Sequence, residues 1–414
     1  MAVIKPFKGI RPTRDKAHLV ASRAVNTYKP RLLNAKLEEN PYTFLHVILP
    51  EHGQKATTKP NTTERFKLVK KQFQHFVKQG ILIEDKKPCL YLYRQVKGSN
   101  VYMGIIGGSG VEDYNKGVIC IHEQTLTKRE EVFRNYLDVC GFNAEPVLLA
   151  YENISAIDKL CKKISSTRPE FEFTTSDKIT HCLWVIDKKT ELEIIQSNFK
   201  KLPAVYIADG HHRSSSSALL AAERKKKNKK HTGTEMYNFC MSLFMPVDQM
   251  RIYEFNRLVK SVNGMSDADI ISKLKERFSV TALTSNKKPA ARHIIHMFLS
   301  GKWYKLEPNK GLFNPKHPVE SLDAQIVTDH ILGPVFGITD LKTDPRVGFA
   351  GGHLGASYLE NQINNKKSAV AFALYPVSFK ELKAVADNKL IMPPKSTWVE
   401  PKLRSGLVIQ NLEE

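Results

Sequence analysis

The segment from Ala204 to Leu220 constrains the fold of this chain more than any other part of the sequence. It begins with a short apolar run of β-branched and aromatic residues, continues with Asp209-Gly210, and ends in residues that can form a helix. Such an apolar run predicts a buried strand, and an Asp-Gly pair allows the backbone to reverse tightly. The segment therefore predicts a strand, a sharp turn and a helix start.

Basic side chains follow this turn directly. The backbone N–H groups and the positive dipole end of a helix start attract anions, and His211, His212 and Arg213 add donors suited to phosphate oxygens. Four serines, Ser214 to Ser217, offer further capping and donor groups. We interpret the turn as an anion site. The alternative is a strand-to-helix connection with an exposed basic rim and no ligand.

The charge balance favours acidic partners. The chain has 63 Lys and Arg against 42 Asp and Glu, a formal net charge of +21, which suits nucleotides, phosphorylated metabolites, nucleic acid or anionic surfaces. The dense basic run at 224–231 lacks aromatic residues that would stack on bases, so we interpret it as a solvated helix end or loop. Six widely spaced cysteines without a C-x-x-C pair predict reduced thiols and no zinc site. No signal sequence or membrane span is visible, so we expect a cytoplasmic protein.

The hydrophobic pattern predicts a mixed α/β protein in three parts. We expect an N-terminal α/β region over 1–115, a catalytic core over 116–260 and a C-terminal α+β lobe over 261–414 that completes the substrate site. The predicted elements include a strand at Phe44–Leu49, a helix at Thr63–Gln79, paired strands at Leu90–Val96 and Val101–Ile106, and helices at Thr127–Val139 and Asp267–Phe278.

Several familiar sites are excluded by spacing. The chain has no P-loop, and the run from Gly107 to Gly110 lacks the glycine order of a dinucleotide cradle, so we interpret it as a hairpin or strand-end loop. His122-Glu123 lacks the second histidine that a zinc protease helix would need. Phosphoryl transfer or nucleotide binding remains, and phosphoryl transfer to a hydroxyl needs a carboxylate that accepts its proton.

Two carboxylates are candidates for this chemistry. Glu123 follows a predicted strand in the same α/β unit as the turn, so it can project to the same sheet edge; the alternative is a solvated strand-end residue. Asp209 could bind magnesium or could only form the turn, and the residue pattern leaves both readings open.

The run from Ile207 to Arg213 resembles the signature of a bacterial and protist family known as domain of unknown function 1015. Further blocks spread over nearly the whole chain agree with the family: Pro6-Phe7, Arg11-Pro12, Asn40 to Glu51, Asp113-Tyr114, His122-Glu123-x-Thr125, Glu145-Pro146-Val147, His181-x-Leu183-Trp184, and Met392 to Gly406. The turn is in addition similar to the phosphate loop of the ParB/sulfiredoxin-like fold, which includes kinases that phosphorylate free L-serine.

This resemblance implies a ParB-like nucleotide-binding core and an ATP- or ADP-dependent, magnesium-dependent kinase that forms O-phospho-L-serine. It places the catalytic carboxylate on Glu123, preceded by His122. It places the nucleotide phosphates on the turn from Asp209 to Arg213. With the helix start included, we expect Asp209, Gly210, His211, His212, Arg213 and Ser214 to hold the phosphates, and Asp209 to assist catalysis as a metal ligand or to orient the turn. Two departures are visible: Cys120-Ile121 replaces a proline context, and Ser22 to Tyr28 lacks the Pro-Pro-Tyr-Asp of many relatives.

The amino-acid end of the substrate is assigned to a polar loop. Lys395, Ser396, Thr397 and Trp398 follow two prolines, and Arg11 and His46 are further candidates for holding a carboxylate. The structural alternative is that the prolines only shape a turn while Trp398 fills the core. The donor (ATP, ADP, CTP or pyrophosphate), the hydroxylated acceptor and the oligomeric state stay open.

Two other function classes remain. One is a ParB-like module gated by CTP or ATP without metabolic turnover. The other is a nucleic-acid-binding protein driven by the positive net charge, although we do not expect nucleic acid as the partner.

Overall fold

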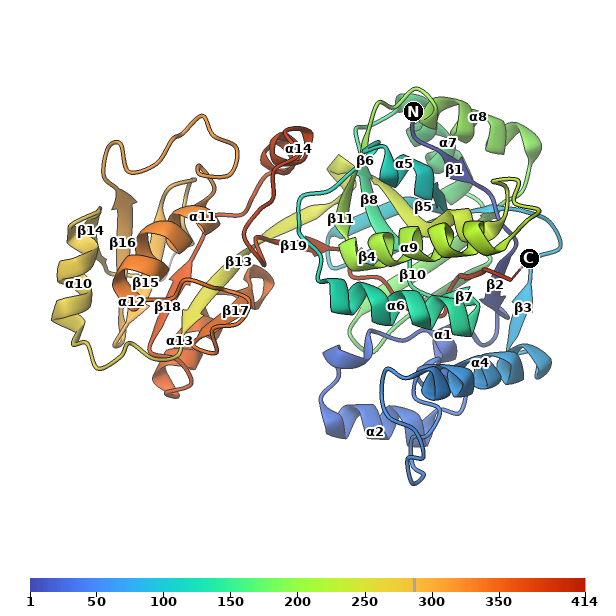
Figure 1. Cartoon of the computed structure of the whole chain (residues 1–414), viewed down its shortest axis with the longest axis horizontal. Helices are drawn as coiled ribbons and strands as arrows, with labels where there is room; N and C mark the ends of the chain where they lie inside the picture. Colours follow the sequence, from blue (N-terminus) through green and yellow to red (C-terminus); the bar gives the residue numbers. More distant parts are fainter. Residues whose placement is uncertain (286–287, 414) are drawn as a thin grey trace. The chain divides into compact units, whose positions relative to one another are not determined.

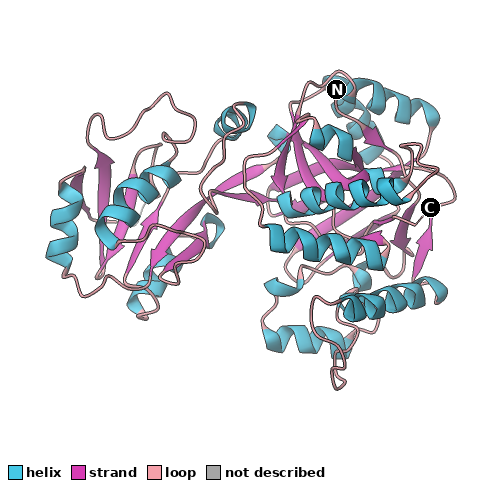
Figure 2. Cartoon of the chain, in the orientation of Figure 1, coloured by secondary structure: helices cyan, strands magenta, loops and turns pink. Residues whose placement is uncertain are grey.

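The computed structural model describes residues 1–285 and 288–413, which form two compact units. The first unit contains residues 1–120, 125–250 and 401–414, and the second contains residues 121–124 and 251–400. Both units combine helices with strands (Figure 2), which confirms the mixed class expected from the sequence. The expected boundaries at residues 115 and 260 stay a prediction.

The described part of the first unit is built on a nine-stranded sheet with strand order β6-β11-β8-β12-β5-β4-β10-β9, and β1 pairs with β5. β4 and β5 form the expected antiparallel pair, whereas β6 pairs in parallel with β11 and β8 in parallel with β12. The bounds are β1 Ile4–Lys5, β4 Leu90–Lys97, β5 Asn100–Gly110, β6 Ile119–Cys120, β8 Val147–Tyr151, β9 Phe171–Thr174, β10 Ile179–Ile186, β11 Val205–Asp209 and β12 Phe239–Pro246.

Helices cover this sheet, and α6 packs against α9 (Figure 1). A smaller sheet in the same unit has the order β3-β2-β20-β7. The bounds are α1 Ala17–Val20, α2 Pro30–Glu39, α3 Leu45–Ile48, α4 Thr63–Lys78, α5 Val111–Asn115, α6 Thr127–Cys140, α7 Ser155–Ser165, α8 Lys189–Phe199, α9 His211–Lys227, β2 Gly9–Pro12, β3 Leu82–Glu84, β7 Phe142–Asn143 and β20 Ile409–Asn411. Short 3₁₀ turns occupy Val25–Thr27 (η1), Met236–Asn238 (η2) and Val247–Gln249 (η3).

Two apolar cores hold the first unit together. In one, Leu149, Phe199 and Phe244 pack among residues of the large sheet and of α7 and α8. In the other, the buried face of α4 packs against Phe44 and Phe142. These cores follow from helix periodicity, because apolar residues three and four apart share one face of a helix. The helices expected at 63–79 and 127–139 are thereby confirmed within a residue at each end.

The second unit has a seven-stranded sheet with the order β14-β16-β15-β18-β13-β17, and β19 pairs with β13. Serine caps with reciprocal carboxylates begin two of its helices, α10 and α14. The bounds are β13 Arg251–Val259, α10 Asp267–Lys275, β14 Phe278–Leu283, β15 Ile295–Leu299, β16 Lys302–Pro308, α11 Asp323–Val327, η4 Thr328–Leu332, α12 Gly333–Phe336, β17 Val347–Gly351, η5 Gly352–Leu354, α13 Ala356–Asn364, β18 Val370–Ala373, α14 Phe379–Asp387 and β19 Thr397–Glu400.

Three local predictions are wrong. The run Phe44–Leu49 is not a strand, because its apolar residues wrap around one helical turn in α3 and are buried against α4. The run from Gly107 to Gly110 lies inside β5 rather than in a loop; a Cβ at Gly107 would lie 2.7 Å from side-chain atoms of Ile4 and Leu90. The helix expected to reach Phe278 ends at Lys275, and Phe278 begins β14.

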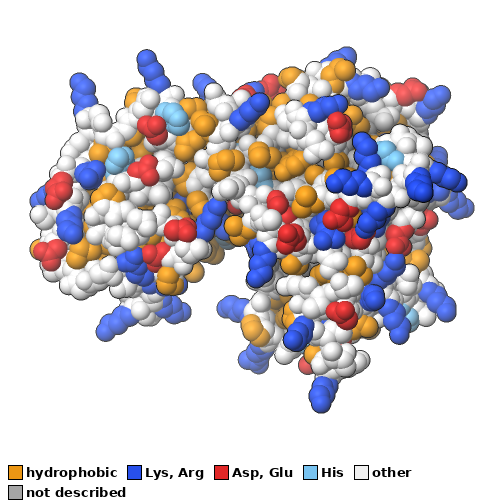
Figure 3. All heavy atoms as spheres, in the orientation of Figure 1, with side chains coloured by type: hydrophobic (Ala, Val, Ile, Leu, Met, Phe, Trp, Pro, Cys, Tyr) orange, Lys and Arg blue, Asp and Glu red, His pale blue; other side chains and the backbone are white. Residues whose placement is uncertain are grey.

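The surface agrees with the charge pattern of the sequence. Arg224 to Lys227 form the last turn of α9, where the three lysines are exposed, which confirms the basic run as a solvated helix end. On the face seen in Figure 3, Lys and Arg side chains are scattered among acidic ones.

The six cysteines are free. No helix in the described residues is long and apolar enough to cross a membrane.

The third residue of β10 is a buried histidine, which predicts an acid-sensitive fold. His181 is fully buried between the rings of Tyr93 and Phe173, and its Nδ1 lies 2.7 Å from the Tyr93 hydroxyl. Burial, assisted by the charge of Arg404, lowers the pKa of His181 to about 3. The unfolded chain takes up this proton below about pH 6.5, whereas the folded protein does not. The free energy of unfolding is therefore at its full value above that pH and falls as the pH drops towards 3.

We expect His181→Phe to reduce the loss of unfolding free energy between pH 6 and 4 by about 1 kcal/mol per pH unit. Urea unfolding followed by circular dichroism at several pH values measures this slope. His75→Phe, at an exposed position on α4, is the control and keeps the wild-type slope. An unchanged slope in the His181 variant would contradict the prediction.

Candidate functional site

The turn expected from the sequence is present between β11 and α9. β11 ends at Asp209, Gly210 adopts a left-handed conformation with φ 104° and ψ 29°, and α9 begins at His211. The N–H groups of Arg213 and Ser214 donate to the Gly210 carbonyl at 2.9 and 3.1 Å, so the N–H groups before them lie at the open end of the helix. The turn therefore presents a positive helix terminus directly at the end of a buried strand.

Two cations hold the Asp209 carboxylate. Arg213 Nη2 lies 3.0 Å from Oδ2, and Lys402 Nζ lies 3.0 Å from Oδ1. Burial alone would raise the pKa of Asp209, but the charges of Lys402 and Arg213 and the hydrogen bond from Lys402 lower it below its ordinary value. Asp209 is therefore ionised at neutral pH. Its side chain keeps 41% of its surface exposed, which leaves it accessible to a ligand.

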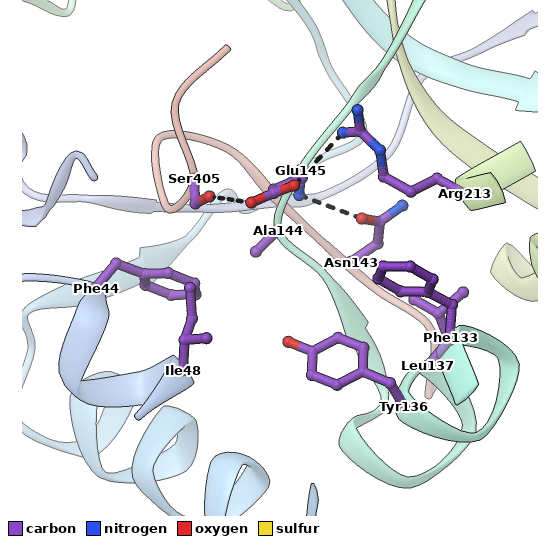
Figure 4. Close-up of a pocket in the computed structure, with 10 residues that line it drawn as sticks. All are labelled: Phe44, Ile48, Phe133, Tyr136, Leu137, Asn143, Ala144, Glu145, Arg213 and Ser405. Carbon is purple, nitrogen blue, oxygen red and sulfur yellow. Dashed lines mark hydrogen bonds and ion pairs between the residues drawn. The ribbon is translucent and has the colours of Figure 1, made fainter. Parts of the chain in front are cut away.

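Arg213 also reaches a second carboxylate. Its Nη1 donates to the Pro146 carbonyl at 2.7 Å and lies 3.7 Å from Glu145 Oε2. The Ser405 hydroxyl donates to the other oxygen of Glu145 at 2.5 Å (Figure 4). Sequence reasoning did not assign Lys402 or Glu145 to the site. Both lie in blocks that carry the family resemblance, and this was the available signal.

The left-handed backbone makes Gly210 sensitive to substitution. A side chain disfavours this conformation, and a Cβ here would lie 3.1 Å from Arg213 Nε and Nη2. We expect Gly210→Ala to lower the unfolding free energy by about 1–2 kcal/mol. Chemical denaturation measures it, with Gly53→Ala as the control because Gly53 shares a positive φ but has open space at its Cβ position. A larger loss in the control would show that crowding at the turn is unimportant.

Three of the four serine hydroxyls donate hydrogen bonds to groups within the protein. The hydroxyls of Ser215 and Ser216 donate to the His212 carbonyl, and that of Ser217 donates to the Cys240 sulfur. All four serines are buried, and α9 has no side-chain cap. The expectation that all four serines, Ser214 to Ser217, offer capping and donor groups is therefore wrong, because this face of α9 packs within the protein. Ser214 as a phosphate donor remains a proposal.

His122 and Glu123 lie in the loop between β6 and α6, in the second of the two compact units. His122 is buried, and its carbonyl accepts a hydrogen bond from the Met392 N–H at 2.9 Å. Burial lowers the pKa of His122 to about 4, so its ring is neutral at pH 7. Glu123 is half-buried. The catalytic assignments of both residues remain proposals.

The loop at 395–398 is tied into the second unit. The Lys395 carbonyl accepts from the buried Arg257 at 2.6 Å, and the Ser396 hydroxyl donates to the Pro393 carbonyl at 2.7 Å. Thr397 begins β19, and the Trp398 ring stacks on His353 with ring centroids 4.2 Å apart. These contacts suit a structural role, while the Lys395 side chain is exposed.

Arg11 and His46 have partners within the first unit. Arg11 forms ion pairs with Asp85 at 2.9 Å and Glu170 at 3.0 Å, and it is buried. His46 Nε2 lies 3.1 Å from the Asn40 carbonyl. Since the carboxylates already occupy the Arg11 guanidinium, we leave both residues out of the site proposed below.

Comparison with known proteins identifies the family of this chain. The family model described as "Protein of unknown function (DUF1015)" matches residues 4–325. The chain belongs to the DUF1015 family. This membership confirms the resemblance found in the sequence, and no curated protein matches the chain.

Among solved structures, this DUF1015 chain is distantly similar to a free serine kinase mutant in complex with AMP, at 12% identity and a TM-score of 0.38 over 73% of this chain and 91% of that chain. A free serine kinase mutant in complex with ADP gives 13% identity and a TM-score of 0.37, covering 75% and 93%. C-terminally truncated SbnI from Staphylococcus aureus gives 12% identity and a TM-score of 0.39, covering 73% and 85%.

Proposed function

We propose that this DUF1015 protein is a nucleotide-dependent kinase that transfers a phosphoryl group to the hydroxyl of free L-serine or a closely related hydroxy amino acid. ATP or ADP is the proposed donor, with Mg²⁺. The observation that carries the proposal is the Gly210 turn, where a helix terminus meets Arg213 and Lys402 at the end of a strand. The similarity of this turn to a phosphate loop supports the same reading.

The charges at the turn suit a polyphosphate. Arg213 offers a planar fork of donors and Lys402 a compact charge, and both can share their charge between Asp209 and phosphate oxygens. Phosphoryl transfer depends mainly on positioning and charge neutralisation, so such a cradle supplies most of what the reaction needs. Among the described residues, no group of three or more His, Cys, Asp or Glu side chains could hold a metal ion by itself.

Asp209 nevertheless fits Mg²⁺, because this ion commonly takes one or two protein carboxylates together with substrate phosphates and water. The side chain is ionised and partly exposed, as this role requires. Bound Mg²⁺ would neutralise charge on the transferring phosphoryl group.

Glu123 is the proposed general base. It would accept the proton of the acceptor hydroxyl while that oxygen forms a bond to phosphorus and the nucleotide leaves as the bond to its bridging oxygen breaks. β6 and β11 run in parallel with Ile119 opposite Val205, so both strands end at the same sheet edge, and Glu123 follows shortly after β6. This strand order supports the assignment. The neutral ring of His122 would orient the loop rather than carry charge.

We further infer a ParB-like core over residues 116–260, with the region 1–115 and the lobe 261–414 on either side in sequence. The parallel pairs β6–β11 and β8–β12 and the helices α6 and α9 lie within this proposed core. Lys395 to Trp398 are the proposed contacts for the amino-acid substrate.

The test incubates purified protein with Mg²⁺, one of ATP, ADP, CTP or pyrophosphate, and one of L-serine, L-threonine or homoserine. Mass spectrometry detects the phosphorylated amino acid, which we expect with serine and an adenine nucleotide. Nucleotide binding without any phosphorylated product would overturn the kinase and favour the gated binding module. No phosphorylated product, together with RNA or DNA binding that weakens steeply as salt is raised, would favour the nucleic-acid alternative, and the absence of such salt-dependent binding would remove it.

A further inference from the structure

A pocket opens beside Arg213 in the first unit. It has a volume of about 170 Å³. Its walls come from α3, α6 and the segment after β7, and Figure 4 shows the side chains facing one another across it. The lining residues are Phe44, Ile48, Phe133, Tyr136, Leu137, Asn143, Ala144, Glu145, Arg213 and Ser405. An apolar cavity of about 150 Å³ can hold a benzene ring, so this pocket has room for a planar ring.

The walls suit a flat aromatic ligand. Phe44 and Leu137 are buried, whereas Phe133 keeps 39% of its surface exposed. A phenylalanine beside a pocket provides a face on which a base can stack. Most of the pocket wall is therefore apolar, and polar groups come from the edge formed by Asn143, Glu145 and Arg213 together with Ser405 and the Tyr136 hydroxyl (Figure 4).

Asn143 supplies a donor at this edge. The residue is only 6% exposed, and its Oδ1 accepts the Glu145 N–H at 3.2 Å. The Asn143 side chain lines the pocket, and its Nδ2 carries two hydrogens that can donate to an acceptor on a ligand.

Glu145 supplies the complementary acceptor. Its Oε1 takes the Ser405 hydroxyl, and its Oε2 makes only a 3.7 Å ion pair with Arg213. An ionised carboxylate has about four lone-pair sites, so acceptor capacity remains. A ring that presents both an acceptor nitrogen and an amino donor would satisfy Asn143 and Glu145 together.

Arg213 joins the pocket to the turn. Its guanidinium contacts Asp209 on the turn and Glu145 on the pocket edge. The Arg213 guanidinium thus lies between the turn and the pocket, as the ribose of a nucleotide lies between the base and the first phosphate.

We propose that this pocket binds the adenine base of the nucleotide whose phosphates the turn holds. The inference rests on the proposed function and adds to it a base site and a preference. The adenine amino group would donate to Glu145 and a ring nitrogen would accept from Asn143, while Phe133 stacks on the ring. The guanine carbonyl oxygen would instead face the Glu145 carboxylate, so adenine is preferred over guanine.

Isothermal titration calorimetry with ATP, GTP and inorganic tripolyphosphate, each with Mg²⁺, tests this proposal. We expect wild type to bind ATP at least about fivefold more tightly than tripolyphosphate or GTP. Phe133→Ala should weaken ATP binding about fivefold or more and leave tripolyphosphate binding unchanged. Asn143→Asp keeps the acceptor for the Glu145 N–H, removes the donor, and should have the same selective effect.

Leu219→Ala is the matched control, since Leu219 is 41% exposed, lies on α9 and does not line the pocket. Thermal melts confirm that each variant is folded. Equal affinities of wild type for ATP, GTP and tripolyphosphate, or unchanged ATP binding in both folded pocket variants, would overturn the base site and leave the phosphate turn standing. Wild type that binds neither ATP nor tripolyphosphate would overturn the turn and the base site together.

Discussion

Glu123→Gln is expected to lower kcat for phosphorylation of the hydroxy amino acid by about 10²- to 10⁴-fold. Glutamine keeps the shape of the side chain but cannot accept the hydroxyl proton. The Kd for ATP should stay within about twofold, because the proposed phosphate contacts come from the Gly210 turn and not from Glu123. Steady-state kinetics with product detection and calorimetry with ATP measure the two quantities.

The control for Glu123→Gln changes a carboxylate that is close in sequence but outside the proposed site. Glu131, exposed on α6, provides it, and Glu131→Gln should retain the wild-type kcat. Full turnover of Glu123→Gln would remove Glu123 as the base. Equal losses of kcat and ATP affinity would instead assign Glu123 to nucleotide binding.

Arg213→Met is expected to weaken ATP binding by about 10- to 100-fold. The guanidinium bridges Asp209, the Pro146 carbonyl and Glu145, and its removal leaves two carboxylates with less positive charge beside the proposed phosphate site. The remaining negative charge would repel a polyphosphate. The pKa of Asp209 should rise, since Arg213 is one of the charges that lower it.

Arg213→Lys tests whether ATP binding depends on the positive charge of Arg213 alone or also on the planar shape of its guanidinium. Lysine restores one positive charge but not the planar fork, so its ATP affinity should lie between those of wild type and Arg213→Met. Arg224→Met is the control, because Arg224 lies on the same helix but pairs with Asp138 at 3.0 Å. Wild-type ATP affinity in folded Arg213→Met would contradict a phosphate role for the turn.

Local sequence was sufficient where short-range forces decide conformation. The strand, the Asp-Gly reversal and the helix around Gly210 were predicted because an apolar run and a glycine that tolerates positive φ act within a few residues. The helix at 63–79 and the paired strands at 90–96 and 101–106 were predicted for the same reason. The short run Phe44–Leu49 was misread, because a brief apolar stretch suits a strand and a helix equally until its packing is known.

The sequence by itself determined the family, the mixed class of the fold and the turn that places a helix terminus at the end of a strand. Only the tertiary structure brought Lys402 to Asp209 and Glu145 to Arg213, turned three serine hydroxyls into the protein, and formed a pocket from α3, α6 and the segment after β7. The physical reason is that a hydrophobic pattern records that a face is buried but not against what. Contacts between residues far apart in the chain depend on how all the elements pack.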